Sequence, residues 1–157
     1  MMRVRDVMTK EPITIDPDAP VATALAVMQQ KGVRHLPVVG DDGRLAGLIT
    51  DRDLRSALFA PALAEHLSAG MRWHLRRATR ALEELRVGDA MTWDAVTTHP
   101  EASLAQAAAV MLEARVGCLP VVEHGGLVGI VTERDVLRAL AGTLPSVRGI
   151  DPDTCLW

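Results

Sequence analysis

Apolar residues recur at every third or fourth position in two segments of the chain, one in each half. That spacing places the side chains on one face of a helix, which a folded domain buries. The positions are Val21, Leu25 and Met28 in the first segment, and Leu104, Ala107, Ala108 and Met111 in the second. Ser103 and Gln106 precede the second segment at the spacing of a capping box, which is typical of a helix start. We therefore predict two amphipathic helices.

Nearly continuous apolar runs follow each predicted helix and indicate short strands. In the first half they cover residues 36–39 and 45–49, and the turn between them contains the Asp-Gly pair typical of a β-hairpin. Because polar residues do not alternate with the apolar ones, both faces of the sheet are expected to be covered. A shorter extended piece is expected at residues 13–15, before the helix. A second helix should follow each hairpin, with Leu54 and Leu58 in the first half and Val136, Leu137 and Leu140 in the second.

The two halves are copies of each other at an offset of 83 residues, which aligns Val4 with Val87. The shared motifs are Val-x-Asp-x-Met-Thr at Val4 and Val87 and Leu-Pro-Val-Val at Leu36 and Leu119. The turn that follows is one residue shorter in the second copy, and Gly-x-x-Thr-x-Arg-Asp then recurs at Gly47 and Gly129. Each copy is predicted to be β-α-β-β-α, so the fold class is α/β. A small sheet with two short helices can hardly close its own core. We therefore expect the repeats to pack sheet against sheet about a pseudo-twofold axis.

The repeats divide the chain into four parts: a first repeat at 1–60, a helical linker at 61–86, a second repeat at 87–142, and an irregular tail at 143–157. Pro61 is expected to end the preceding helix. Within the linker, apolar residues return at helical spacing and four arginines lie around them. The apolar residues are Met71, Leu75, Ala78, Leu82 and Leu85, and the arginines are Arg72, Arg76, Arg77 and Arg80.

A hydroxyl, a guanidinium and a carboxylate stand where each repeat passes from strand to helix. They are Thr50, Arg52 and Asp53 in the first repeat, and Thr132, Arg134 and Asp135 in the second. The first N–H groups of a helix lack partners within it, so such a corner attracts anions. Thr-x-x-Asp before a helix is also close to a capping box in its own right. The local pattern alone favours the cap.

Composition and charge exclude several classes of function. The net charge of −3 argues against a general nucleic-acid binder, and no apolar run approaches the roughly 20 residues that span a bilayer. The N-terminus lacks the apolar region of a signal peptide, and two cysteines are too few for a disulfide framework, so a cytoplasmic location is expected. Metal-ligand spacings, nucleophile motifs and phosphate loops are absent from the sequence, and Asp6 and Asp89 are expected to cap local turns. We expect no catalysis and no metal site.

In their order, spacing and duplication, these motifs resemble the cystathionine β-synthase (CBS) domains, as a tandem pair over residues 4–59 and 87–141. The resemblance implies a stand-alone regulatory module without a catalytic cofactor. Its ligand would be an adenosine-containing molecule, AMP, ADP, ATP or S-adenosylmethionine, bound in two clefts between the repeats. The module would form a homodimer and signal to an unknown protein partner in trans.

The resemblance also implies roles for individual residues. Thr50 and Thr132 would contact phosphate, and Asp53 and Asp135 would contact ribose. The adenine pockets would be lined by Thr14, Ile15 and His35, and by Thr97, Thr98 and Cys118. From the residues alone, His35 is expected to be a packed or partly exposed side chain and Cys118 a small buried hydrophobe.

Several alternatives stay open. Arg52 and Arg134 can offer bidentate contacts to phosphate or form surface ion pairs with Asp51 and Glu133. The corner motifs can be helix caps alone, in which case the protein is a ligand-free structural or dimerisation module. The arginines of the linker helix allow a nucleic-acid-associated regulator, which the negative net charge disfavours.

Overall fold

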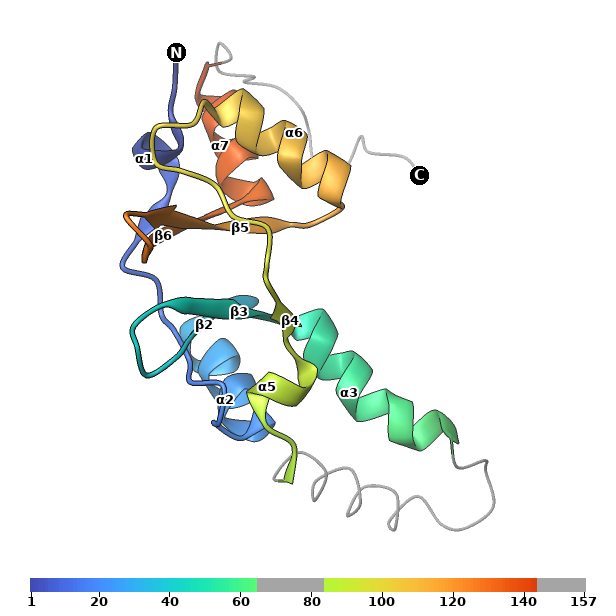
Figure 1. Ribbon diagram of the computed structural model, residues 1–157. Coiled ribbons are helices and arrows are strands. Elements are labelled where there is room, and N and C mark those ends of the chain that lie inside the picture. Colours follow the sequence, from blue (N-terminus) through green and yellow to red (C-terminus); the bar gives the residue numbers. More distant parts are fainter. Residues whose placement is uncertain (65–83, 144–157) are drawn as a thin grey trace, which may run out of the picture.

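Two three-stranded antiparallel sheets face each other in the computed structural model, which describes residues 1–64 and 84–143 (Figure 1). The first sheet has the order β2-β3-β4, with β2 at His35–Val39, β3 at Leu45–Thr50 and β4 at Thr92–Trp93. The second has the order β1-β6-β5, with β1 at Thr9–Lys10, β6 at Gly126–Thr132 and β5 at Cys118–Glu123. The predicted α/β class and the sheet-to-sheet packing of two repeats are confirmed.

Helices lie on the outer side of each sheet (Figure 1). The first sheet carries α2 (Val21–Lys31), α3 (Asp51–Ala64) and α5 (Val87–Ala90), and the second carries α1 (Val4–Val7), α6 (Leu104–Ala114) and α7 (Glu133–Thr143). The predicted cap of α6 is present, because the Ser103 hydroxyl accepts the Gln106 N–H at 3.1 Å. Asp6 and Asp89 cap the short helices as predicted, each accepting a hydrogen bond from the N–H three residues earlier.

Each sheet contains one strand from the beginning of the other repeat. Thr9 pairs with Ile130 in the second sheet, and Trp93 pairs with Gly47 in the first. The predicted extended piece at 13–15 makes only one parallel bridge, from Ile15 to Val38. The Val-x-Asp-x-Met-Thr motif therefore forms a helical turn and a short strand that dock onto the opposite half of the molecule.

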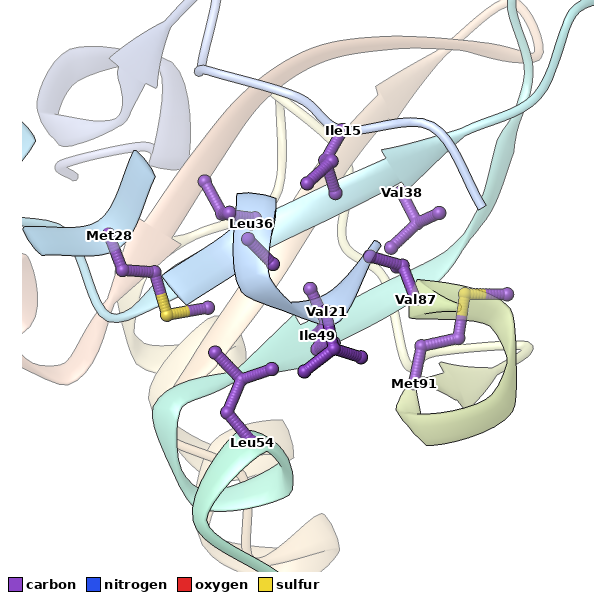
Figure 2. Close-up of a cluster of buried hydrophobic side chains, with 10 residues drawn as sticks. Ile15, Val21, Met28, Leu36, Val38, Ile49, Leu54, Val87 and Met91 are labelled. Carbon is purple, nitrogen blue, oxygen red and sulfur yellow. The ribbon is translucent and has the colours of Figure 1, made fainter. Parts of the chain in front are cut away.

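The exchanged segments complete both hydrophobic cores. Val87 and Met91, at the beginning of the second repeat, pack against Val38 and Ile49 of the first (Figure 2). Val4, at the beginning of the first repeat, is fully buried in the core of the second. Ion pairs from Arg3 and Arg5 to Glu101 add a surface contact to the same attachment. Neither core is complete without residues from the other half.

The second helices carry the predicted apolar residues, and one of these helices ends later than predicted. On α7, Val136 contacts the core, whereas Leu137 and Leu140 are 64% and 56% exposed. In the first repeat α3 continues through Pro61 to Ala64, because a missing N–H costs one helical hydrogen bond without requiring the helix to end. The predicted linker helix between Met71 and Leu82, and all of the predicted tail except Thr143, lie outside the described residues.

Candidate ligand-binding corners

The junction of β3 and α3 holds Thr50 and Asp53 in a closed hydrogen-bonded ring. The Asp53 carboxylate accepts the Thr50 N–H at 2.8 Å and the Thr50 hydroxyl at 2.7 Å through the same oxygen, Oδ2. The Thr50 hydroxyl in turn accepts the Asp53 N–H at 3.3 Å. This is a complete capping box, as the local pattern favoured.

The junction of β6 and α7 repeats that geometry closely. Asp135 Oδ2 accepts the Thr132 N–H at 2.9 Å and the Thr132 hydroxyl at 2.7 Å, and the hydroxyl accepts the Asp135 N–H at 3.4 Å. In each corner the second carboxylate oxygen, Oδ1, has no partner within the described part of the chain. The carboxylates are therefore oriented by the cap and keep one oxygen available to a hydroxyl donor.

One amide in the first turn of each helix stays without a partner among the described residues. The Asp51 N–H donates to the Arg34 carbonyl, and the Asp53 N–H is taken by the cap, which leaves the N–H of Arg52. The second corner is equivalent, because the Glu133 N–H donates to the Gly117 carbonyl and leaves the N–H of Arg134. An anion at either corner would meet this amide, since the Thr hydroxyl proton is already donated to the Asp carboxylate.

The two corner arginines are exposed and form no ion pair with any described residue. The carboxylate proposed as a partner for Arg52, that of Asp51, instead receives a hydrogen bond from Arg55 at 2.9 Å. Arg52 and Arg134 are therefore available for a phosphate, which is the contact that a guanidinium makes well.

The residues predicted for the adenine pockets fall into two groups. Ile15 is 8% exposed and points into the first core, while its backbone N–H and carbonyl bond to Pro37 and Val39. Thr98 makes the equivalent backbone bonds to Pro120 and Val122. Thr14 and Thr97 are exposed, and their backbone groups have no partner among the residues that the structure places. Backbone recognition of a base edge therefore rests on Thr14 and Thr97.

Thr97 lines a cavity that the sequence did not predict. Its volume is ≈ 350 Å³, and it lies by the hairpin turns, away from Thr132 and Asp135. It is lined by Arg44, Leu45, Ala46, Gly47, Asp94, Ala95, Thr97, Val122 and Gly125. Arg44 and Asp94 occupy turn positions, where a charged residue is ordinary, so no sequence signal marks the cavity.

His35 and Cys118 lie directly beside the corners. Each is the cross-strand partner of a corner threonine, His35 of Thr50 and Cys118 of Thr132. Cys118 is 2% exposed and packs with Leu48 and Ile130 where the sheets meet, so its expected burial is confirmed. Burial raises the pKa of the Cys118 thiol to about 12, and the carboxylates of Glu133 and Asp53 act in the same direction.

The imidazole of His35 reaches the opposite repeat. A Cβ added to Gly117 would lie 3.7 Å from His35 Nε2 and 3.8 Å from Glu133 Oε2. Burial lowers the pKa of His35, and the positive charge of Arg34 acts the same way. The carboxylates of Asp51, Glu133 and Asp53 oppose that shift. Groups from both repeats therefore meet at this end of the sheets.

The described residues form neither a candidate metal site nor a candidate membrane span. No group of three or more His, Cys, Asp or Glu side chains is placed to hold a metal ion. None of the described helices combines the length and apolar character that a bilayer crossing requires.

Comparison with known proteins identifies relatives over nearly the whole chain. A family model of the CBS domain matches residues 4–60 and 87–142. A CBS domain-containing protein of Dictyostelium discoideum is 36% identical over 148 residues, covering 92% of this chain and 94% of that protein. Other relatives are longer: the chain spans 42% of the uncharacterised protein MJ1404 of Methanocaldococcus jannaschii and 24% of a homoserine O-acetyltransferase of Methanococcoides burtonii.

Solved structures share the fold. CBSX2 of Arabidopsis thaliana, crystallised in complex with AMP, has a TM-score of 0.71 at 30% identity, covering 90% of this chain and 98% of that chain. The CBS domain pair of MJ0100, in complex with 5′-methylthioadenosine and S-adenosyl-L-methionine, has a TM-score of 0.72 at 26% identity, covering 92% and 99%.

Proposed function

Because the chain belongs to the family of CBS-domain proteins, we propose that it is a non-catalytic regulatory module that binds an adenosine-containing ligand between its two repeats. AMP, ADP, ATP and S-adenosylmethionine are the candidate ligands. Two solved structures of the same fold carry adenosine-containing ligands, which supports this class. The observation that carries the proposal is the duplicated corner: each copy holds one amide, one arginine and one carboxylate oxygen that no described residue engages.

These groups match the parts of a nucleotide. The free N–H of Arg52 or Arg134 and the neighbouring guanidinium are donors for phosphate oxygens. The Oδ1 atoms of Asp53 and Asp135 are acceptors for ribose hydroxyls, as an acidic residue is in dinucleotide-binding folds. The exposed backbones of Thr14 and Thr97 are candidates for the adenine edge. No residue is assigned to bond making or breaking.

Signalling would proceed by a shift between conformations. A ligand held between the repeats favours the arrangement to which it binds more tightly, and a protein partner that recognises this arrangement is regulated in trans. We place this module in the cytoplasm, as its low cysteine content indicates.

A second copy of the chain is the proposed partner of α7. Leu137 and Leu140 stand three positions apart on this helix, so they share one face of it, and they are 64% and 56% exposed. Sedimentation equilibrium should give a dimer for the wild type and a monomer for Leu137→Glu. A monomeric wild type would contradict the proposed homodimer. It would not bear on the proposed binding of a ligand.

Thermal unfolding with each candidate ligand tests the main proposal. A ligand at about 100 times its dissociation constant stabilises the folded state by ~2.7 kcal/mol. Asp53→Ala and Asp135→Ala should each lose about 1 kcal/mol as a helix cap. At least one of them should also lose the ligand-induced rise. Ser103→Ala is the matched control, because it removes a similar cap from α6, away from both corners.

A ligand-free structural role is the second candidate, and the complete capping boxes favour it. In that case no ligand raises the unfolding midpoint, and Asp53→Ala, Asp135→Ala and Ser103→Ala differ only in the stability that each cap contributes.

A further inference from the structure

The cavity that Thr97 lines lies at the opposite end of the sheets from both corners. Strand β3 begins at the cavity with Leu45 and ends at the first corner with Thr50. A strand rises about 3.3 Å per residue, so these two ends of β3 are about 16 Å apart. Gly125, just before the start of β6, also lines the cavity, and Thr132 lies at the far end of that strand. Thr97 is the only candidate nucleotide contact among the lining residues, so the cavity is a separate space.

The walls of this cavity are built from smaller residues than the equivalent surface of the other half. Ala46 and Ala95 line the cavity. The repeated motifs align Ala46 with Val128, and the offset of 83 residues aligns Ala95 with Pro12. The larger side chains therefore stand on the side that lacks the charges described next.

Two opposite charges border the cavity without pairing. Arg44 ends the hairpin turn, where its carbonyl accepts the Gly40 N–H and its N–H donates to Asp42 Oδ1, each at 3.0 Å. These bonds fix its backbone, while its guanidinium makes no ion pair or hydrogen bond with any described residue. The carboxylate of Asp94 is likewise unengaged within the described part of the chain. Because the counterpart of Arg44 is Gly126, this pair of charges belongs to one side of the molecule only.

We propose that this cavity binds a free α-amino acid with an apolar side chain. The guanidinium of Arg44 can hold the α-carboxylate through two parallel hydrogen bonds, and the carboxylate of Asp94 can accept hydrogen bonds from the α-ammonium group. Ala46 and Val122 offer apolar surface to the ligand's side chain. A ligand with a single charge would leave one of the two protein charges unsatisfied. The volume of ≈ 350 Å³ fits a small molecule, since ligand pockets span about 300–1,000 Å³.

Calorimetric titration of the whole protein with L-valine, L-leucine and L-methionine tests this assignment. The titrations extend to about 10 mM, because a ligand with so few atoms binds in the micromolar to millimolar range. At least one of the three should bind at one site per chain. Its amide, which lacks the carboxylate, and its N-acetyl derivative, which lacks the ammonium group, should each bind about tenfold more weakly.

Variants of the protein test the same contacts from the other side. Arg44→Gln and Asp94→Asn should each weaken binding about tenfold. Ala46→Val, which introduces the residue of the other half, should weaken it by filling the cavity. Glu11→Gln is the matched control, because Glu11 is the counterpart of Asp94 and shares its positive φ, 47° against 50°, but does not line the cavity. It should leave the affinity unchanged.

Three results would overturn the assignment. One is that none of the three amino acids binds. Another is equal affinity for the amino acid and its two derivatives, which would show that the charges are not recognised. The third is displacement of the bound amino acid by AMP, which would place it in the nucleotide site. Thermal unfolding without ligand checks that each variant is folded, and the derivatives probe both charges in the wild type even if a variant is not.

Discussion

Gly47 of β3 lies against the backbone of Thr92, so closely that an added Cβ would come within 2.3 Å of the Thr92 carbonyl oxygen. The equivalent contact in the other sheet joins Gly129 to the strand that contains Thr9, where an added Cβ would lie 3.0 Å from the Thr9 carbonyl. A glycine thus stands where each exchanged strand pairs with its sheet. The repeated glycine of the Gly-x-x-Thr-x-Arg-Asp motif has this steric role.

Gly47→Ala should destabilise the protein by roughly 1–3 kcal/mol, because a backbone carbonyl has to move to admit the methyl group. Chemical denaturation measures the loss. Gly142→Ala is the control: it lies in α7 with nothing within 4 Å of the added Cβ, so it should be neutral or slightly stabilising. Equal losses of stability for the two variants would contradict the close contact between Gly47 and the Thr92 carbonyl.

The exchange of segments predicts that a core substitution acts on the opposite repeat. Val4→Ala should cost roughly 2 kcal/mol, because Val4 is fully buried in the second core. Hydrogen exchange should then speed up in β5 and β6 more than in β2 and β3. Val87→Ala should show the reverse pattern. Faster exchange confined to the repeat that contains the substituted valine would refute this.

The free energy of unfolding should fall as the pH drops below 6.5. Burial keeps the pKa of His35 below that ordinary value in the folded protein, so the unfolded chain binds more protons in this range. The contribution of His35 to the free energy of unfolding is fully present above pH 6.5. It is lost as the pH falls through the lower pKa that His35 has in the folded protein.

Urea denaturation between pH 7.5 and 5.5 measures this dependence, with His35→Gln as the non-titrating control. The nearby carboxylates of Asp51, Asp53 and Glu133 and the guanidinium of Arg34 are common to both proteins. If the free energy of unfolding depends on pH identically in the wild type and in His35→Gln, His35 does not contribute to this dependence.

The thiol of Cys118 should be inert in the folded protein. It is 2% exposed and its pKa is raised to about 12, so almost no reactive thiolate forms at pH 8. In a Cys155→Ser background, a thiol reagent such as DTNB should react only after denaturation. Rapid reaction under native conditions would show that the contact between the sheets opens readily.

Local patterns were sufficient for much of this structure. The spacing of Val21 and Met28 identified a buried helix face, and Ser103 with Gln106 identified a helix start, because both effects act within one or two turns. The Thr-x-x-Asp pattern of the corners likewise predicted the helix caps that the structure shows. Its roles in ligand binding came from the family resemblance and stay predictions.

Pairings across the molecule could not be predicted in the same way. The apolar character of Val4 and Val87 demands burial but does not say in which repeat. The exposure of Leu137 depends on how α7 meets its sheet, and the position of His35 depends on a glycine in the other half of the chain. These relationships exist only once the two repeats are assembled.

The exchanged strands also set the order of events during synthesis on the ribosome. Thr9 pairs with Ile130, so the segment with Val4 and Thr9 has no native partner until almost the whole second repeat has been made. The sheet of the first repeat is likewise incomplete until Thr92 and Trp93 have been synthesised. Such distant pairings slow folding and leave apolar surface open to aggregation meanwhile. An isolated repeat would lack the third strand of its sheet and would keep that surface exposed.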